Sequence, residues 1–264
     1  MNKLTSHVNA PDVSVIVPVR NGARTLARCL EALTRQVTRY SYELIVVDND
    51  SEDESRKIAA GFDVKLLNET ERHSSYAARN LGIQTARGRY LLFIDADCRP
   101  TPNWLETLAR ALESDVCDLC SAAVVFEHAN PFSPFELYDS ISNMQIERDI
   151  TRRKLSKTAN LAVKRGLFDA LGTFDGRLQS GGDVIWTSNA TRAGYKLAFC
   201  AGSPVFHPAR SLREVIEKQF RVGRGQVAIW KDSPFPTHAA IGSLFNKAVA
   251  ASPPMVAYRM NRAL

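Results

Sequence analysis

The most constraining feature of the sequence is an apolar run that ends in two aspartates, within the stretch RYLLFIDADCRP. The run from Tyr90 to Ile94 has the length and the continuous hydrophobicity of a strand that is buried on both faces of a sheet. Asp95 and Asp97 follow where this strand would emerge at its carboxyl end, the edge at which open α/β sheets bind ligands. Two carboxylates this close repel each other unless a cation or several donors neutralise them. The pattern therefore predicts a site for a divalent metal that carries phosphate. A loop aspartate that caps the helix beginning near Pro102 is the alternative.

Strands and helices alternate along the chain on both sides of this run. Apolar runs of strand length lie at 13–19, 42–47 and 62–67 before it, and at 116–126, 158–163, 195–200 and 204–206 after it. Segments with helical spacing or helix-start residues lie at 25–36, 54–60, 74–86, 102–112, 165–171, 181–193 and 212–230. Short connections between alternating strands and helices imply right-handed crossovers. The sequence therefore predicts an α/β fold with a parallel, doubly wound sheet.

The chain is expected to divide within an irregular, polar segment at 128–157, which contains Pro131, Pro134 and a cluster of basic residues. The expected division is an N-terminal tail at 1–12, a domain at 13–230 with a nucleotide half at 13–127 and an acceptor half at 128–230, and a helical extension at 231–264. That extension has two short amphipathic pieces separated by prolines. It either packs on the domain or makes a peripheral contact with an anionic inner membrane face.

Composition and charge exclude several classes of protein. Charged residues make up 23% and hydrophobic residues 45% of the 264 residues, as in ordinary globular domains. The net charge of +6 suits an anionic ligand or a membrane surface, but no lysine-rich run with interleaved aromatics indicates nucleic acid. The five cysteines are scattered, and Cys117 and Cys120 form an isolated pair, so reduced thiols are favoured over a zinc site. The first residues lack a secretory apolar segment, and no run has the length of a membrane span. We therefore expect a cytoplasmic protein.

Several motifs occur in the order that is typical of one enzyme family. They are VSVIVPVRNGARTLARCLEAL, ELIVVDNDSEDES, YAARNLGIQTARGRYLLFIDADCRPTPNWL, GTFDGRLQSGGDVIW, and PVFH before a basic helix. With these motifs the chain resembles family 2 glycosyltransferases of the GT-A fold, from about Val13 to Trp230. The resemblance implies a Rossmann-like, mostly parallel sheet flanked by helices, with an acceptor-binding C-terminal half. It also implies inverting transfer of a sugar from a nucleotide-diphosphate sugar, UDP-sugars being favoured, to a hydroxyl of a saccharide, a lipid-linked acceptor or a small molecule. Such reactions build cell-surface polysaccharides, glycolipids or natural-product glycosides.

The resemblance assigns nucleotide binding to residues at the ends of the first strands. These residues are Pro18, Arg20, Asn21, Asp48 and Asp50, with Arg79 near the base or phosphates. A carboxylate such as that of Asp48 accepts hydrogen bonds from a base N–H or from ribose hydroxyls. The alternatives are a turn or helix-capping role for Asp48 and a solvated helix face for Arg79. Asn49 departs from the family pattern, which has a second aspartate there.

The resemblance also assigns a manganese or magnesium site. Asp97 would bind the ion directly, Asp95 would contact ribose or reach the ion through water, and His207 matches a ligand position. The ion is needed because the leaving diphosphate gains negative charge. Arg221 and Arg224 lie three residues apart on one helix face, where they would either clamp the diphosphate or form a solvated basic surface.

The candidate catalytic base is Asp183, at a predicted helix start after Gly181 and Gly182. Glycines let the backbone approach a sugar closely, and free N–H groups at a helix start favour a carboxylate. The family usually has Glu-Asp there, so Gly182 is a departure that removes one neighbouring acid. Asp183 would deprotonate the acceptor hydroxyl, which attacks the anomeric carbon opposite the nucleotide. Trp186, one turn later, would stack on a sugar ring or belong to the core.

Two other functions compete with glycosyl transfer. A nucleotidyltransferase would carry a glycine-rich loop after the first strand, whereas PVRNGAR supplies one glycine. A non-catalytic nucleotide-sugar-binding module of the same fold would not need Asp95, Asp97, Asp183 and His207 together.

Overall fold

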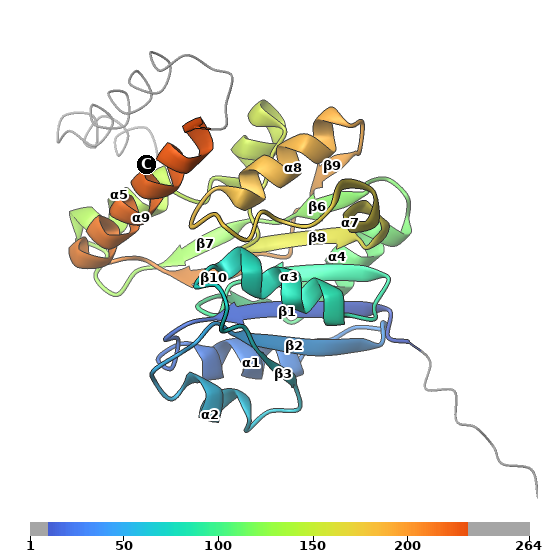
Figure 1. The fold of residues 1–264 in the computed structure, drawn as a ribbon, viewed down its shortest axis with the longest axis horizontal. Helices are drawn as coiled ribbons and strands as arrows, with labels where there is room; N and C mark the ends of the chain where they lie inside the picture. Colours follow the sequence, from blue (N-terminus) through green and yellow to red (C-terminus); the bar gives the residue numbers. More distant parts are fainter. Residues whose placement is uncertain (1–9, 232–264) are drawn as a thin grey trace, which may run out of the picture.

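A seven-stranded sheet forms the centre of the computed structural model, which describes the backbone of residues 10–231 and the side chains of residues 10–223 (Figure 1). From one edge to the other the strands are β3 (Lys65–Asn68), β2 (Tyr42–Asp48), β1 (Val13–Val19), β4 (Tyr90–Ile94), β8 (Asn160–Lys164), β6 (Leu119–Ser121) and β9 (Leu197–Phe199). All neighbouring strands are parallel except that β8 is antiparallel to β4 and β6. The predicted α/β class with a mostly parallel sheet is therefore confirmed.

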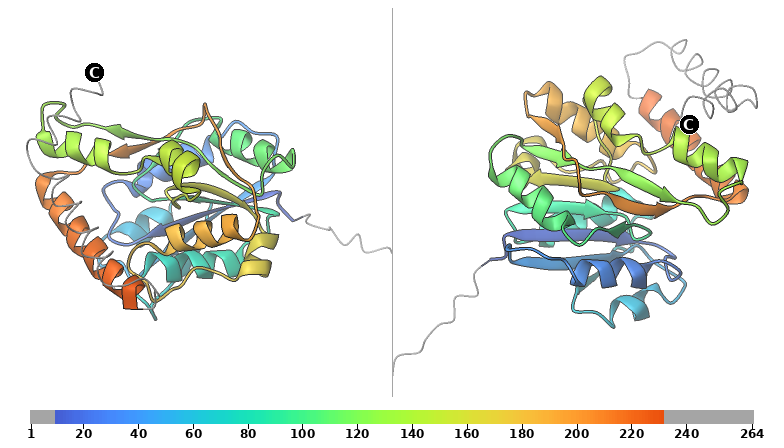
Figure 2. Two further views of the ribbon diagram at one scale, coloured as in Figure 1. Left: turned by 90° about the horizontal axis from the view of Figure 1, so that it is seen from above. Right: turned by 180° about the vertical axis from the view of Figure 1, so that it is seen from behind.

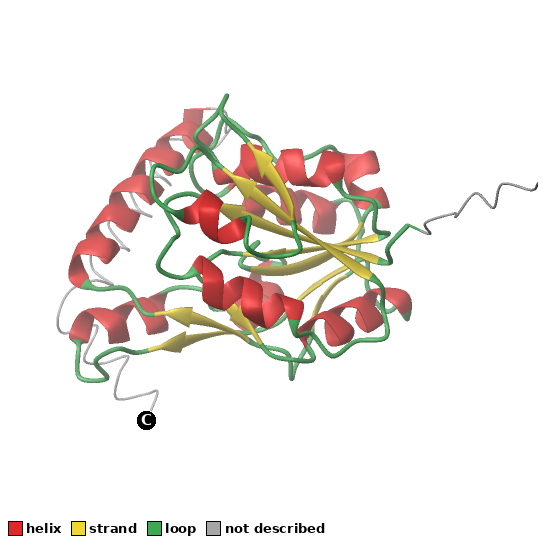
Figure 3. Ribbon diagram, turned by 90° about the horizontal axis from the view of Figure 1, so that it is seen from below, coloured by secondary structure: helices red, strands yellow, loops and turns green. Residues whose placement is uncertain are grey.

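Helices cover both faces of this sheet, as the view in Figure 3 shows. They are α1 (Leu26–Thr34), α2 (Ser55–Ala59), α3 (Ser75–Thr85), α4 (Trp104–Glu113), α7 (Gly166–Leu171) and α8 (Gly182–Arg192). All seven residues of β1 are buried, and successive side chains of a strand point to opposite faces. Val15 and Val17 therefore pack in the core cluster of α1 and α4, whereas Ile16 packs in that of α3, α7 and α8. Burial on both faces explains why β1 and β4 are continuous apolar runs.

A second, three-stranded sheet lies beside the first. Its order is β5 (Arg99–Pro100), β10 (Val205–Pro208) and β7 (Val124–Glu127). Two helices lie next to each other near this sheet, α5 (Pro134–Ser142) and α9 (Leu212–Lys231) (Figures 1 and 2). The chain between α5 and β8 forms α6 (Ile146–Arg148) and a π-helical turn at Asp149–Arg153. This sheet and helix pair carry several polar side chains of the candidate site.

The structure corrects the prediction at two places. The run expected as one strand at 116–126 is two strands, β6 and β7, which belong to different sheets. The segment expected to be irregular at 128–157 is largely helical, because Ser133 caps α5 through a hydrogen bond from the Glu136 N–H and Pro134 begins the helix.

The expected division into halves stays a prediction, although strands on both sides of residue 128 share one sheet. The predicted membrane contact through 231–264 concerns residues that lie, apart from Lys231, outside the described part of the chain. Within residues 10–231, none of the helices has the length and hydrophobicity needed to cross a bilayer.

Gly88 lies just before β4 and packs against the backbone at the start of β1. A Cβ at this position would lie 2.5 Å from the Ser14 nitrogen and 2.6 Å from the Val13 carbonyl carbon. We expect Gly88→Ala to lower the free energy of unfolding by about 1–3 kcal/mol, because strand backbone cannot yield as a flexible side chain does. Urea denaturation measures this loss. Gly166→Ala is the control, since no atom lies within 4 Å of a Cβ there. An equal loss in both variants would contradict the explanation.

Candidate active site

Two loops at the carboxyl ends of β1 and β2 are joined by hydrogen bonds. The Asn21 N–H donates to Ser51 Oγ at 2.9 Å, and the Glu52 N–H donates to Asn21 Oδ1 at 2.8 Å. Asn21 and Asp50 adopt left-handed conformations with φ of 50° and 59°, which asparagine and aspartate tolerate better than most residues. The structure thus brings together the ends of the first two strands, as predicted.

Asp48 is fully buried at the end of β2 and has one unsatisfied oxygen. Its Oδ2 accepts a hydrogen bond from the Ser51 N–H at 3.1 Å, so it does stabilise a turn. Its Oδ1 has no hydrogen-bond partner among the described residues. A buried carboxylate oxygen without a donor is costly, and a ligand N–H or hydroxyl would satisfy it. Asn49, in contrast, is occupied, because its amide donates to the Glu69 and Arg72 carbonyls at 3.1 and 2.7 Å.

The other residues predicted to bind nucleotide at this edge differ in exposure. Pro18 is buried within β1 opposite Val47, so that only its place near the strand end relates it to the site. Arg20 and Asp50 are exposed on the loops. Their nucleotide roles stay predictions.

Arg79 on α3 is buried rather than solvated. It is 4% exposed, and its Nη2 donates to Asp95 Oδ1 at 2.5 Å. Burial raises the pKa of Asp95 above its usual value, even though the charge of Arg79 acts in the opposite direction. The alternative of a solvated helix face is therefore wrong for Arg79. Its guanidinium holds the first aspartate of the motif in place.

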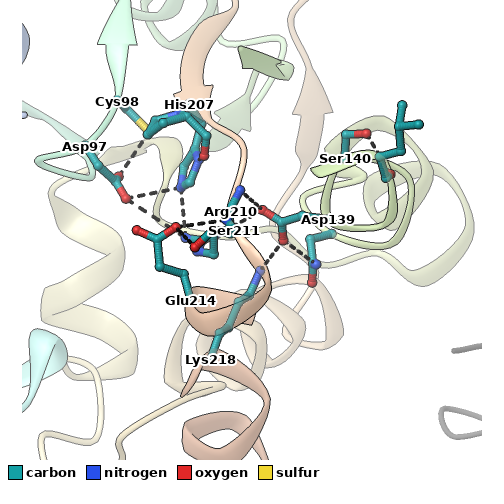
Figure 4. Close-up of polar contacts among 12 residues, drawn as sticks. Asp97, Cys98, Asp139, Ser140, His207, Arg210, Ser211, Glu214 and Lys218 are labelled. Carbon is teal, nitrogen blue, oxygen red and sulfur yellow. Dashed lines mark hydrogen bonds and ion pairs between the residues drawn. The ribbon is translucent and has the colours of Figure 1, made fainter. Parts of the chain in front are cut away.

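Asp97 and His207 face each other across the end of β4 and the strand β10 (Figure 4). His207 Nδ1 lies 2.6 Å from the Pro208 carbonyl oxygen, which assigns a proton to Nδ1 and turns Nε2 toward the site. That Nε2 lies 3.2 Å from Asp97 Oδ2. A protonated imidazole would donate to Asp97 across this distance, and a neutral one would offer its Nε2 lone pair to a cation that the carboxylate also binds.

The ionisation of the neighbouring groups fits a hard divalent metal. Burial acts to raise the pKa of Asp97, but the adjacent His207 and Arg210 outweigh it and lower this pKa to about 2. Burial, with the charges of Asp97 and Asp95, raises the pKa of the Cys98 thiol well above its usual value. The ligand atoms of Asp97, Cys98 and His207 lie within 4.8 Å of one another, but the neutral thiol is a poor ligand for such an ion. A carboxylate and an imidazole remain, and this pair fits manganese or magnesium with oxygen atoms of a ligand completing the coordination.

The carboxylate of Asp183, in the first turn of α8, is held by four donors. Its Oδ1 accepts from Tyr76 Oη and from the Val184 N–H, both at 2.9 Å. Its Oδ2 accepts from the Thr158 N–H at 3.0 Å and from Thr158 Oγ1 at 3.3 Å. Tyr76 connects this carboxylate to the first aspartate of the D-x-D motif, because the Arg79 guanidinium that pairs with Asp95 lies 5.6 Å from the centroid of the Tyr76 ring. The predicted base and Asp95 are thus linked through two neighbouring side chains of α3.

Tyr76 explains the departure from the family pattern at Gly182. A Cβ at position 182 would lie 3.0 Å from the Tyr76 ring, which is tighter than ordinary contacts allow. The space that a glutamate would need is thus filled by the residue that orients Asp183. Tyr76 was not predicted as a site residue, although it lies in the same YAARN motif as Arg79.

Trp186 does not have the predicted role in binding an acceptor. Its ring stacks on Phe168 at a centroid distance of 4.4 Å and packs against Phe174, and the residue is 5% exposed. Its Nε1 donates to the Gly172 carbonyl at 2.8 Å. The structure therefore shows the alternative that the sequence left open, a core tryptophan, because the helical spacing from Asp183 places Trp186 among the core residues of α7 and α8.

The cations nearest to Asp97 differ from those expected. Arg221 is exposed on α9, and the side chain of Arg224 lies outside the described part of the chain. Arg210 instead lies at the pair, with its Nη2 at 2.9 Å from His207 Nε2 and 4.0 Å from Asp97 Oδ2. The sequence did offer a signal for Arg210, since it follows His207 by three residues and lies in the short loop before α9.

The chain is similar in sequence to known glycosyltransferases. The sequence model of the family described as glycosyl transferase family 2 matches residues 14–176. Glycosyltransferase AglE of Haloferax volcanii is 42% identical over 226 residues, which are 83% of this chain and 74% of that protein. A pre-mycofactocin glycosyltransferase of Mycobacterium tuberculosis is 27% identical over 218 residues, which cover 79% of this chain but only 45% of that protein.

Solved structures share the fold. The mannosyltransferase PcManGT from Pyrobaculum calidifontis, in complex with GDP-Man and Mn²⁺, superposes with a TM-score of 0.61 at 22% identity, over 97% of this chain and 80% of that chain. TarS of S. aureus, in complex with UDP-GlcNAc, gives a TM-score of 0.58 at 21% identity, over 76% and 59% of the two chains. These likenesses confirm the predicted fold.

Proposed function

Because the chain belongs to glycosyl transferase family 2, we propose that it transfers a sugar from a nucleoside-diphosphate sugar to an acceptor hydroxyl, with inversion at the anomeric carbon. The observation that carries this proposal is the linked set of Asp95, Asp97, Asp183 and His207, in which Asp97 faces His207 while Tyr76 and Arg79 connect Asp183 with Asp95. A cation-binding pair and a separate, hydrogen-bonded carboxylate are what a single displacement requires.

The donor would lie across the ends of β1, β2 and β4. Asp48 Oδ1 would accept a hydrogen bond from the base or ribose, which supplies the missing partner of this buried oxygen. Arg20, Asn21 and Asp50 belong to the loops that follow β1 and β2. A UDP-sugar is the favoured donor. The two solved structures named above contain UDP-GlcNAc and GDP-Man, so the nucleotide base of the donor must be identified by experiment.

Asp97 and His207 would hold a manganese or magnesium ion, and Asp95, fixed by Arg79, would contact ribose or a water on the ion. Such an ion, when bound, stabilises the negative charge that develops on the leaving diphosphate.

Asp183 is the proposed base. Both of its oxygens already accept two hydrogen bonds, of which the contact to Thr158 Oγ1, at 3.3 Å, is the longest. An acceptor hydroxyl would replace this contact, because the threonine hydroxyl can rotate away whereas the Thr158 N–H cannot. Tyr76 and the backbone donors keep the carboxylate oriented while it takes the proton from the acceptor oxygen. That oxygen then attacks the anomeric carbon from the face opposite the diphosphate.

A thermal-shift panel tests the donor site. With manganese and one of UDP, GDP or dTDP, the melting temperature of the full chain is expected to rise by roughly 5 °C at ligand concentrations near 100 times the dissociation constant, since a ligand that binds only the native state stabilises it. The same nucleotide with EDTA should give a much smaller shift. No shift with any of the three nucleotides and either metal would contradict the proposed donor site. A shift without transfer to any acceptor would favour a non-catalytic binding module.

A further inference from the structure

A buried carboxylate on α5 lies at the centre of a cluster of cations. Asp139 is 0% exposed. Its Oδ2 accepts hydrogen bonds from the backbone N–H and the Nη1 of Arg210, both at 3.2 Å. Its Oδ1 accepts from Lys218 Nζ at 3.3 Å and from Asn143 Nδ2 at 2.7 Å. One carboxylate therefore fixes a loop residue just before α9 and a side chain two turns into that helix.

Arg210 connects this carboxylate to the Asp97–His207 pair. Figure 4 shows its side chain between Asp139 on one side and Asp97 with His207 on the other. Its Nη1 contacts Asp139, whereas its Nη2 lies 2.9 Å from His207 Nε2 and 4.0 Å from Asp97 Oδ2. The side chain is 16% exposed. A guanidinium held at both ends is oriented before any ligand arrives, which lowers the entropy lost on binding.

Two cations, Arg210 and Lys218, contact Asp139. Burial, with the nearby charges of Arg210 and Arg221, lowers the pKa of Lys218 to about 8, although Asp139 acts in the opposite direction. Of the other acids, Glu214 caps α9 by accepting hydrogen bonds from the Ser211 N–H at 2.9 Å and Oγ at 2.7 Å, and Asp97 lies 4.0 Å from Arg210 Nη2. Two cations thus contact one buried carboxylate beside the candidate metal ligands, and a third lies near them. Such an arrangement suits an anion that also binds the metal.

We propose that Asp139 is a positioning residue: it fixes Arg210 and Lys218 beside Asp97 and His207, where these two cations bind the diphosphate of the donor. This inference rests on the proposed function and adds to it a residue that touches neither the donor nor the metal. If Asp139 only attached α5 to α9, replacing it would affect folding, and any effect on nucleotide binding would be the same with or without Arg210.

A double-mutant cycle separates these two roles. The dissociation constants of UDP and of GDP, each with manganese, are measured by calorimetry on the full chain and on Asp139→Asn, Arg210→Met and the double variant. We expect Asp139→Asn to weaken the nucleotide that binds wild type about tenfold, since residues in one charged network couple strongly. Arg210→Met should weaken it at least as much, and the double variant should lose clearly less than the product of the two single losses, because part of the effect of Asp139 runs through Arg210. Multiplicative losses in the double variant, or wild-type affinity in folded Asp139→Asn, would overturn the inference.

Asp149→Asn is the matched control. Asp149 is also a buried carboxylate with two cations, Arg153 at 3.1 Å and Lys157 at 2.5 Å, but these cations do not contact Asp97 or His207. This variant should keep the wild-type dissociation constant, and an equal weakening would overturn the inference. If Asp139→Asn does not fold, as judged by circular dichroism, Lys218→Met replaces it, with an expected weakening of several-fold that is absent in Lys164→Met, whose amine pairs with Asp115. If the wild type binds neither UDP nor GDP, the cycle is run with dTDP, and a wild type that binds none of the three would instead refute the proposed function itself.

Discussion

Asp183→Asn is expected to lower the rate of sugar transfer by a factor of about 10²–10⁴, the contribution typical of a general base. The amide keeps the size of the carboxylate but cannot take the acceptor proton. The proposed donor site is at the ends of β1, β2 and β4, whereas Asp183 is in α8. The affinity for metal and nucleoside diphosphate should therefore stay within a few-fold of wild type. Initial rates of transfer, together with nucleotide titrations, measure both quantities once the acceptor is known. Hydrolysis of the donor is the assay until then.

The stability of Asp183→Asn must also be measured, because the new amide NH₂ group would face a hydrogen-bond donor on one side. The amide oxygen can still accept from Tyr76 Oη or from the Thr158 N–H, but not from both. We expect a loss of about 1–3 kcal/mol in the free energy of unfolding, the cost of one unsatisfied buried donor. Asp175→Asn is the control, since this carboxylate lies in the loop before α8 and pairs with Arg177 there. Full transfer activity in Asp183→Asn would show that another group is the base.

The strands, and the sheet edge that carries the candidate site residues, were predictable from the sequence because both depend on local patterns. Strands such as β1 and β4 are buried on both faces, so that each is an unbroken apolar run that stops at a polar residue. Asp48 is the last residue of β2, and Asp95 directly follows β4. The carboxyl ends of these parallel strands meet at one edge of the sheet. The positions of these carboxylates were therefore predictable, with no knowledge of tertiary contacts.

The contacts between side chains from distant parts of the sequence were not predictable. Tyr76 and Asp183 are 107 residues apart, and only the packing of α3 against α8 makes them hydrogen-bond partners. Asp139 and Arg210 are 71 residues apart, and Asp139 lies in a segment whose helical pattern is hidden, since its buried face includes charged residues. Trp186 was misassigned for the related reason that an aromatic residue one turn from a catalytic candidate faces either a ligand or the core, and spacing alone does not distinguish them.

Asp97→Asn is expected to weaken the binding of manganese by at least about 100-fold, more than the loss typical of residues that only support a ligand. The amide keeps the shape of the side chain but removes the negative charge that faces His207 Nε2 at 3.2 Å. The pKa of Asp97 is lowered to about 2, so the wild-type carboxylate is ionised at any pH above about 4. Its protonation therefore does not limit metal binding near neutral pH. Titration of manganese by calorimetry or by its electron paramagnetic resonance measures the change without any assay of transfer.

The loss of metal binding should be separable from a loss of folding. Asp97 is partly exposed, but its partner His207 is buried, so we expect the lost interaction to lower the free energy of unfolding by about 1–2 kcal/mol. The melting temperature of Asp97→Asn without ligand should therefore fall by only a few degrees, whereas the increase caused by manganese with a nucleoside diphosphate should disappear. Asp115→Asn is the control, because this exposed aspartate pairs with Lys164 away from the site. If Asp97→Asn kept the metal-dependent increase, the ion would have to bind elsewhere, and the assignment of Asp97 and His207 as its ligands would fail.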